Sequence, residues 1–170
     1  MKKIFCFLLL FGSFTVYSQS LKKYAIATTG CSVLSYCEPK FNITYSEDSA
    51  KVYTSECGDN DIYYMVICIE LKQTLSPVFK AEAALMTYVN HLKTQFKVIS
   101  STAYSTGHKL NGNEKTRGIA EQWKDDEQFN WKVKGWTDGR FLTVLLVYSK
   151  KDLPETTVNP FLDGLLFKGM

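Results

Sequence analysis

The chain has 170 residues, of which 20 are lysine or arginine and 17 are aspartate or glutamate. This near balance argues against a nucleic-acid-binding protein, because such proteins usually carry a clear basic excess. The length fits one globular domain of ordinary size, which can bury a sufficient core without a structural metal.

The N-terminus has the pattern of an export signal. Lys2 and Lys3 precede an apolar run over residues 4–14. A short positive segment, an apolar core of about ten residues and small residues at the exit are typical of a secretory signal peptide. The run is shorter than the ~20 residues that a membrane-spanning helix needs. We therefore expect cleavage before Gln19 or before Leu21.

Cleavage at the first of these positions predicts a signal peptide over residues 1–18 and a single globular domain over residues 19–170. Removal of two lysines with the signal leaves 18 basic and 17 acidic residues. The rest of the chain has no second long apolar run, so no membrane span is expected after signal removal. The domain is expected to be periplasmic or secreted.

The first half of this domain is predicted to form strands. Residues 41–45 alternate in polarity, residues 46–49 form a polar turn, and residues 50–55 return as the hairpin partner. Residues 56–61 form a second turn before the long apolar strand 62–71. The odd-numbered residues of that strand are all apolar and are expected to face the core: Tyr63, Met65, Ile67, Ile69 and Leu71.

One helix is predicted after this strand. Ser76 is a suitable N-cap, and Pro77 suits the first helical position. Apolar residues then recur at steps of three and four, which indicates an amphipathic helix lying on a sheet. This apolar stripe consists of Val78, Ala81, Leu85, Val89, Leu92 and Phe96.

The chain then returns to strands, which are predicted over residues 97–104, 115–123, 129–134 and 140–149. The last of these is apolar on both faces, as expected for an interior strand that is covered on two sides. Residues 160–167 are predicted to form a short C-terminal helix.

This order of elements predicts an α+β fold, in which an antiparallel sheet carries one long amphipathic helix and one short C-terminal helix. Three motifs in residues 62–167 carry a resemblance to a known family: Gly118-Ile119-Ala120, Asp138-Gly139-Arg140 and the closing Phe161-Leu162-Asp163-Gly164-Leu165-Leu166-Phe167. The pattern resembles the PsbP-like superfamily, which also contains the DcrB-like bacterial envelope proteins. The resemblance implies a noncatalytic α/β sandwich that works through protein contacts.

Four cysteines remain after cleavage: Cys31, Cys37, Cys57 and Cys68. An even number in an exported protein favours disulfides over free buried thiols. The gaps of 5, 19 and 10 residues lack the close pairs of a zinc site.

Strand geometry constrains how these cysteines pair. Cys57 lies at the second turn, and Cys68 lies about six residues along the following strand, or roughly 20 Å away at ~3.3 Å per residue. That distance exceeds the ~7 Å Cα limit of a disulfide. The first hairpin returns Cys37 toward residues 57–59. We therefore favour Cys37–Cys57, with Cys31–Cys68 by elimination; Cys31–Cys37 with two free thiols is the alternative.

No catalytic or metal-binding motif is recognisable. His91 lies off the apolar stripe and His108 lies in a polar loop, so both are expected to be solvated. Residues 59–61 offer oxygens for calcium but lack the EF-hand spacing, and we expect a turn there. Residues 125–127 are expected to be solubilising charges at a hairpin tip. No cofactor is predicted.

Aromatic residues offer one further candidate surface, which could bind sugars. Trp123, Trp131, Trp136, Phe129 and Tyr104 lie in the second half of the chain. Trp131 and Phe129 share the face that alternates with polar residues, so they are expected to fill the core. Trp136 has the opposite parity and is the predicted exposed aromatic contact.

These patterns predict an exported noncatalytic protein that binds another envelope or secreted protein. Two alternatives remain open. One is a secreted hydrolase whose site combines His91 or His108 with scattered residues. The other is a carrier of a small apolar ligand in a pocket between the helix and the sheet.

Overall fold

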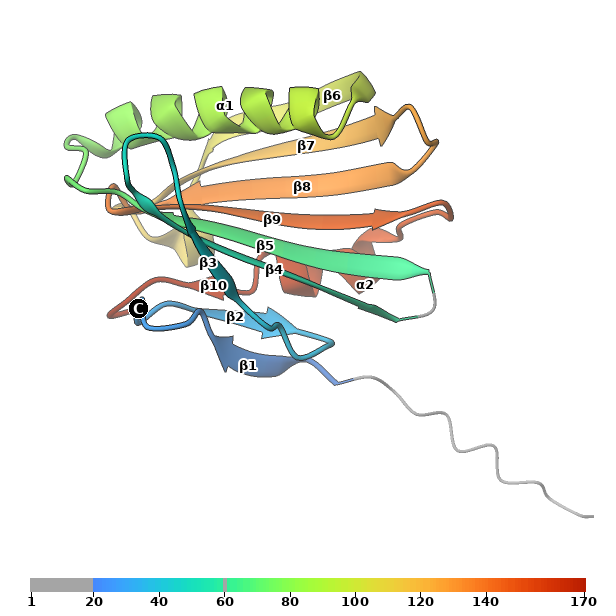
Figure 1. Cartoon of the computed structure of the whole chain (residues 1–170), viewed down its shortest axis with the longest axis horizontal. Helices are drawn as coiled ribbons and strands as arrows, with labels where there is room; N and C mark the ends of the chain where they lie inside the picture. The colour runs from blue at the N-terminus through green and yellow to red at the C-terminus, as the bar shows by residue number, and fades with distance from the viewer. Residues whose placement is uncertain (1–19, 60) are drawn as a thin grey trace, which may run out of the picture.

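The computed structural model describes residues 20–59 and 61–170 and shows the predicted α+β fold (Figure 1). The predicted signal peptide and Gln19 lie outside these residues. Within the described part of the chain, no helix is long and apolar enough to cross a membrane. The elements are β1 (Lys22–Ala25), β2 (Ser32–Ser35), β3 (Asn42–Tyr45), β4 (Lys51–Asp59), β5 (Ile62–Glu70), α1 (Val78–Gln95), β6 (Val98–His108), the short 3-10 helix η1 (Leu110–Gly112), β7 (Arg117–Asp125), β8 (Asn130–Thr137), β9 (Phe141–Ser149), α2 (Glu155–Leu162) and β10 (Leu165–Leu166).

Seven strands form one antiparallel sheet in the order β3-β4-β5-β9-β8-β7-β6. The strand predicted to be interior, β9, lies at its centre, and eight of its nine residues are buried. The predicted β3–β4 hairpin also forms. However, β4 continues to Asp59, which pairs with Ile62, so the second turn is shorter than predicted.

Each face of this large sheet carries a hydrophobic core. The first core lies under α1 and includes Ile67 and Ile69 of β5. The second core includes Tyr64 and Val66 of the same strand, with residues of α2 and of the small sheet β1-β2-β10. The odd-numbered residues Ile67 and Ile69 therefore face a core as predicted, but the even-numbered ones do so as well. A strand between two layers buries both of its faces.

Helix α1 packs on one face of the large sheet, mainly over β7 and β8 (Figure 1). Its apolar stripe is confirmed, because the four central residues are buried: Ala81, Leu85, Val89 and Leu92. The predicted helix start is wrong by one residue. Pro77 has extended backbone angles (φ −70°, ψ 163°), so Val78 is the first helical residue and no side chain caps this end.

The C-terminal helix begins five residues before the predicted position. Helix α2 spans Glu155–Leu162 and contains Pro160, whereas Leu165 and Leu166 form β10. Leu165 pairs with Val33 of β2, which removes this segment from the helix. The predicted short C-terminal helix is thus present, but its bounds differ from the predicted 160–167, because a local pattern around the proline contains no information about that distant strand.

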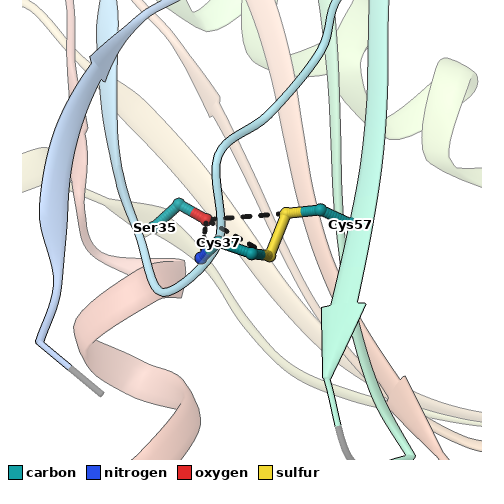
Figure 2. The surroundings of a disulfide bond; sticks show 3 residues. All are labelled: Ser35, Cys37 and Cys57. Carbon is teal, nitrogen blue, oxygen red and sulfur yellow. Dashed lines mark hydrogen bonds between the residues drawn. A yellow bond between two sulfur atoms is a disulfide. The ribbon is translucent and has the colours of Figure 1, made fainter.

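A disulfide joins Cys37 to Cys57 with a Cα–Cα distance of 6.0 Å, which confirms the favoured pairing (Figure 2). It connects the segment after β2 to β4, and the Ser35 hydroxyl lies 3.9 Å from each sulfur. Such a bond is compatible with an extracellular or periplasmic location. The pairing of Cys31 with Cys68 is wrong: both are free thiols in the second core. A thiol packs there as a small apolar group and needs no bond.

Candidate binding groove

A groove runs between the C-terminal half of α1 and strands β4 and β5. One hollow of about 340 Å³ lies beside Tyr88 of the helix, and a second of about 520 Å³ continues toward the β7–β8 hairpin. The two hollows share four lining residues and therefore lie next to each other; together they are here called the α1 groove. The shared residues are Glu56, Met65, Gln95 and Phe96.

Five aromatic rings line the hairpin end of the α1 groove and form a contiguous aromatic cluster. Trp131 stacks on Tyr148 with ring centroids 4.2 Å apart, and it stacks on Phe96 at 4.9 Å. Tyr148 also stacks on Tyr63 at 4.9 Å and meets the edge of Phe129 at 5.5 Å. Trp131 is buried, as predicted, whereas Tyr63 is 38% exposed.

Asp125 forms hydrogen bonds on the buried side of this cluster. Its carboxylate accepts hydrogen bonds from the Trp131 indole at 2.8 Å and from the Phe129 backbone N–H at 2.9 Å. The residue is only 5% exposed, so the prediction that it is a solubilising charge is wrong. A buried carboxylate is stable here because two donors replace its water. Asp126 and Glu127 are exposed as predicted.

The rim of the aromatic cluster is acidic. Four carboxylates and one lysine line this hollow, which gives a formal charge of −3. Glu56 accepts a hydrogen bond from the Tyr148 hydroxyl, and Asp126 lies 3.7 Å from Lys97. Burial and the neighbouring Glu56 raise the pKa of Tyr148 and keep its hydroxyl protonated. Within the described part of the chain, the exposed carboxylate of Glu127 makes no hydrogen bond or ion pair.

A lysine of the same chain already contacts the cluster. The Lys150 ammonium lies 4.8 Å from the centre of the Phe129 ring. Ammonium groups within about 6 Å of a ring centre are attracted to its negative π face. One ring of the cluster therefore binds a cation in the folded protein.

Most of these site residues were not identified from the sequence. Tyr63, Phe96 and Tyr148 come from three segments that only the folded sheet brings together. The one available signal was the parity of Phe129 and Trp131, which places both rings on the same face of their strand. That parity predicts core packing, which is confirmed for Trp131.

The prediction that Trp136 is an exposed aromatic contact is wrong. Its side chain is 4% exposed, and its indole N–H donates to the Leu162 carbonyl at 2.9 Å. The face of β8 that carries Trp136 is covered by α2 and the second core. Alternation along one strand distinguishes its two faces but does not reveal that both are covered.

In the part of the chain that the structure describes, neither histidine is part of a hydrogen-bonded catalytic triad. His91 and His108 are both exposed, as predicted. His108 contacts the Ser105 hydroxyl through its Nε2 atom, but in the described residues no carboxylate is hydrogen-bonded to its ring. Burial raises the pKa of Cys31, and it raises the pKa of Cys68 to about 12, so both thiols stay protonated.

A third hollow of about 430 Å³ lies at the opposite end of the β4–β5 pair, and its walls are mostly polar. There Glu70 accepts a hydrogen bond from Arg140 at 2.9 Å. This bond lowers the pKa of Glu70 below its ordinary value of 4.5. Since the pair joins the end of β5 to the start of β9, we assign it a structural role.

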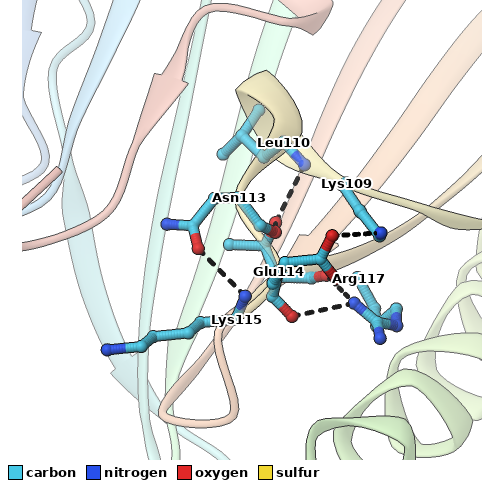
Figure 3. A network of polar contacts seen from close by, with 7 residues as sticks. Lys109, Leu110, Asn113, Glu114, Lys115 and Arg117 are labelled. Carbon is cyan, nitrogen blue, oxygen red and sulfur yellow. Dashed lines mark hydrogen bonds and ion pairs between the residues drawn. The ribbon is translucent and has the colours of Figure 1, made fainter.

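The connection between β6 and β7 carries a separate polar network, far from the hairpin end of β7 (Figure 3). Lys109 pairs with Glu114, and Arg117 donates to the Glu114 carbonyl at 3.0 Å. The Lys115 N–H donates to Asn113 Oδ1 at 2.9 Å, while the Lys115 ammonium points away from the other labelled residues. These bonds fold the connection on itself and offer control positions outside the groove.

Comparisons with known proteins give no family assignment. A scan against models of protein families finds no match, and a search of curated proteins finds no similar sequence. In the described residues, no group of three or more His, Cys, Asp or Glu side chains is arranged to hold a metal ion.

Proposed function

We propose that this is an exported, noncatalytic binding protein that holds a segment of a partner protein in the α1 groove. The observation that supports this function is the pair of adjacent hollows that extends from Asn42 and Tyr88 to the β7–β8 hairpin. An open groove between a helix and a sheet fits an extended or helical segment of another chain. It fits a small apolar ligand less well, since such ligands are usually buried in enclosed pockets.

Two further features support export and protein binding. The predicted signal peptide over residues 1–18 and the disulfide at Cys37 are both expected of an exported protein. The resemblance to PsbP-like proteins implies work through protein contacts, and we retain it as part of this proposal.

Site-specific photo-crosslinking tests the location of the partner. A photoreactive phenylalanine analogue would replace Gln95, which is exposed and lines both hollows. The matched control carries the analogue at exposed Lys115, in the β6–β7 connection. Both variants would be expressed in the producing organism, irradiated, and analysed by mass spectrometry.

We expect Gln95 to give a discrete crosslinked protein that the control does not give. Equal crosslinking from both positions, or none from Gln95, would contradict binding in the α1 groove. Crosslinking from Lys115 alone would place the binding surface on the other end of the sheet.

A further inference from the structure

We propose that the aromatic cluster recognises a positively charged side chain, the ammonium of a lysine or the guanidinium of an arginine, on the bound segment. This inference rests on the proposed function and adds the chemistry of the recognised group. In this proposal the cation contacts the Tyr63 and Phe129 rings of the cluster and the Glu56 and Glu127 carboxylates at its rim.

The rings supply the first part of the argument. An aromatic face carries a partial negative charge and attracts cations, and the attraction is stronger where water is excluded. Tyr148 is stacked between Tyr63, at an interplanar angle of 15°, and Trp131, at 21°. The rings left to a cation are therefore Tyr63, which is 38% exposed, and Phe129, whose face Lys150 already contacts. Asp125 and Trp131 hold the inner side of the cluster rigidly, so little order must be gained on binding.

The carboxylates around the hollow also favour a cation. The lining of the hollow has a formal charge of −3, or −2 with the Lys150 ammonium over the Phe129 ring, and this favours a cation over a neutral or anionic group. Glu127 is exposed and unpaired among the described residues, and it is available to a new cation at the rim. Asp126 is only loosely engaged, since its oxygen lies 3.7 Å from an exposed Lys97 ammonium. A purely apolar partner residue would gain nothing from these charges.

Lys150 supplies the third part, because it shows the same recognition within the chain. Its ammonium lies 4.8 Å from the Phe129 ring, and its side chain is exposed. The adjacent Lys151 is instead paired with Asp61 at 2.6 Å. The two neighbouring lysines thus differ in what their ammonium groups contact, which is the cluster for Lys150 and Asp61 for Lys151.

Titration with small probes tests the inference directly. The protein lacking residues 1–18 would be titrated, by NMR of its aromatic and indole resonances, with Nα-acetyl-lysine N-methylamide and with the arginine equivalent. The matched neutral probe is Nα-acetyl-norleucine N-methylamide, and cellobiose tests the alternative of a sugar site. We expect both cationic probes to shift the resonances of Trp131 and Tyr148 at millimolar concentrations. The neutral probe and cellobiose should not shift these resonances, and added salt should weaken the binding of the cationic probes.

Two pairs of variants make the test specific. Glu127→Gln should weaken the binding of the cationic probes about two- to fivefold, the range of an exposed ion pair. Glu114→Gln in the β6–β7 connection should not change their binding. Lys150→Met should strengthen binding about two- to fivefold, because it frees a ring face that is occupied in the wild type. Lys151→Met removes the same charge from the next residue and should leave the affinity unchanged.

Several outcomes would overturn the inference. Binding of the norleucine probe with the same affinity would show an apolar site, and binding of cellobiose alone would show a sugar site. Equal effects of Lys150→Met and Lys151→Met would show a general charge effect rather than ring contact. Crosslinking from Gln95 does not depend on these probes. A positive crosslink with a negative titration would therefore leave the groove as the binding site and reject only the cationic group.

Discussion

Removal of the Cys37–Cys57 disulfide should lower the free energy of unfolding by about 3 kcal/mol. The cysteines are 20 positions apart, so the bond closes a loop of 21 residues in the unfolded chain. In the chain-entropy model, a loop of that size restricts the unfolded state by about 3 kcal/mol. The loss is a large share of the 5–15 kcal/mol that is typical of folded domains. The bond also holds the segment after β2 against β4, so its loss should loosen the small sheet first.

The double variant Cys37→Ala/Cys57→Ala, in the protein lacking residues 1–18, provides the measurement. Urea titration followed by tryptophan fluorescence gives its free energy of unfolding and its m-value. The wild type with a reductant should approach the stability of the double variant, whereas the variant itself should not respond to the reductant. A loss below about 1 kcal/mol would refute the assignment of a loop-closing role.

A thiol count in denaturant without reductant makes a second check on the same reasoning. The wild-type protein lacking residues 1–18 should show two reactive thiols, those of Cys31 and Cys68. A count of zero would show that the two buried cysteines are joined after all. A count of four would show that Cys37 and Cys57 are not joined by a disulfide.

Four other substitutions test the packing and one charge pair. Leu85→Ala, at a fully buried position of α1, should lower the free energy of unfolding by about 2–5 kcal/mol in the same urea assay. Its control is Met86→Ala, at a residue 42% exposed, which should change the free energy of unfolding by less than about 0.5 kcal/mol. Gly118→Ala should cost about 1–3 kcal/mol, because its Cβ would lie 2.3 Å from Cε3 of the buried Trp136 ring; an unchanged urea midpoint would contradict this close approach. The pKa of Glu70 is lowered by its arginine partner, so the pair stabilises the fold above pH 4.5 and is lost as the pH falls through the folded-state pKa. Glu70→Gln should therefore lose less stability than the wild type between pH 5 and pH 3, as measured by thermal unfolding at each pH.

Local patterns in the sequence were sufficient where the physical cause is itself local. The spacing of Ala81, Leu85, Val89 and Leu92 predicted α1 because a helix returns to the same face every three to four residues. The apolar residues on both faces of β9 predicted an interior strand, because successive side chains of a strand point to opposite faces of the sheet. The hairpin and the cysteine spacing together predicted the Cys37–Cys57 bond, although the second turn proved tighter than assumed.

Only the tertiary structure decided which faces are covered and which rings meet. Trp136 is buried because α2 and the small sheet cover the second face of the large sheet, and nothing in the alternation along β8 indicates that cover. The aromatic cluster joins Tyr63, Phe96 and Tyr148 across elements far apart in the chain. Such contacts depend on strand order and on the docking of α1, since periodicity defines the face on which a side chain lies but not what is packed against it.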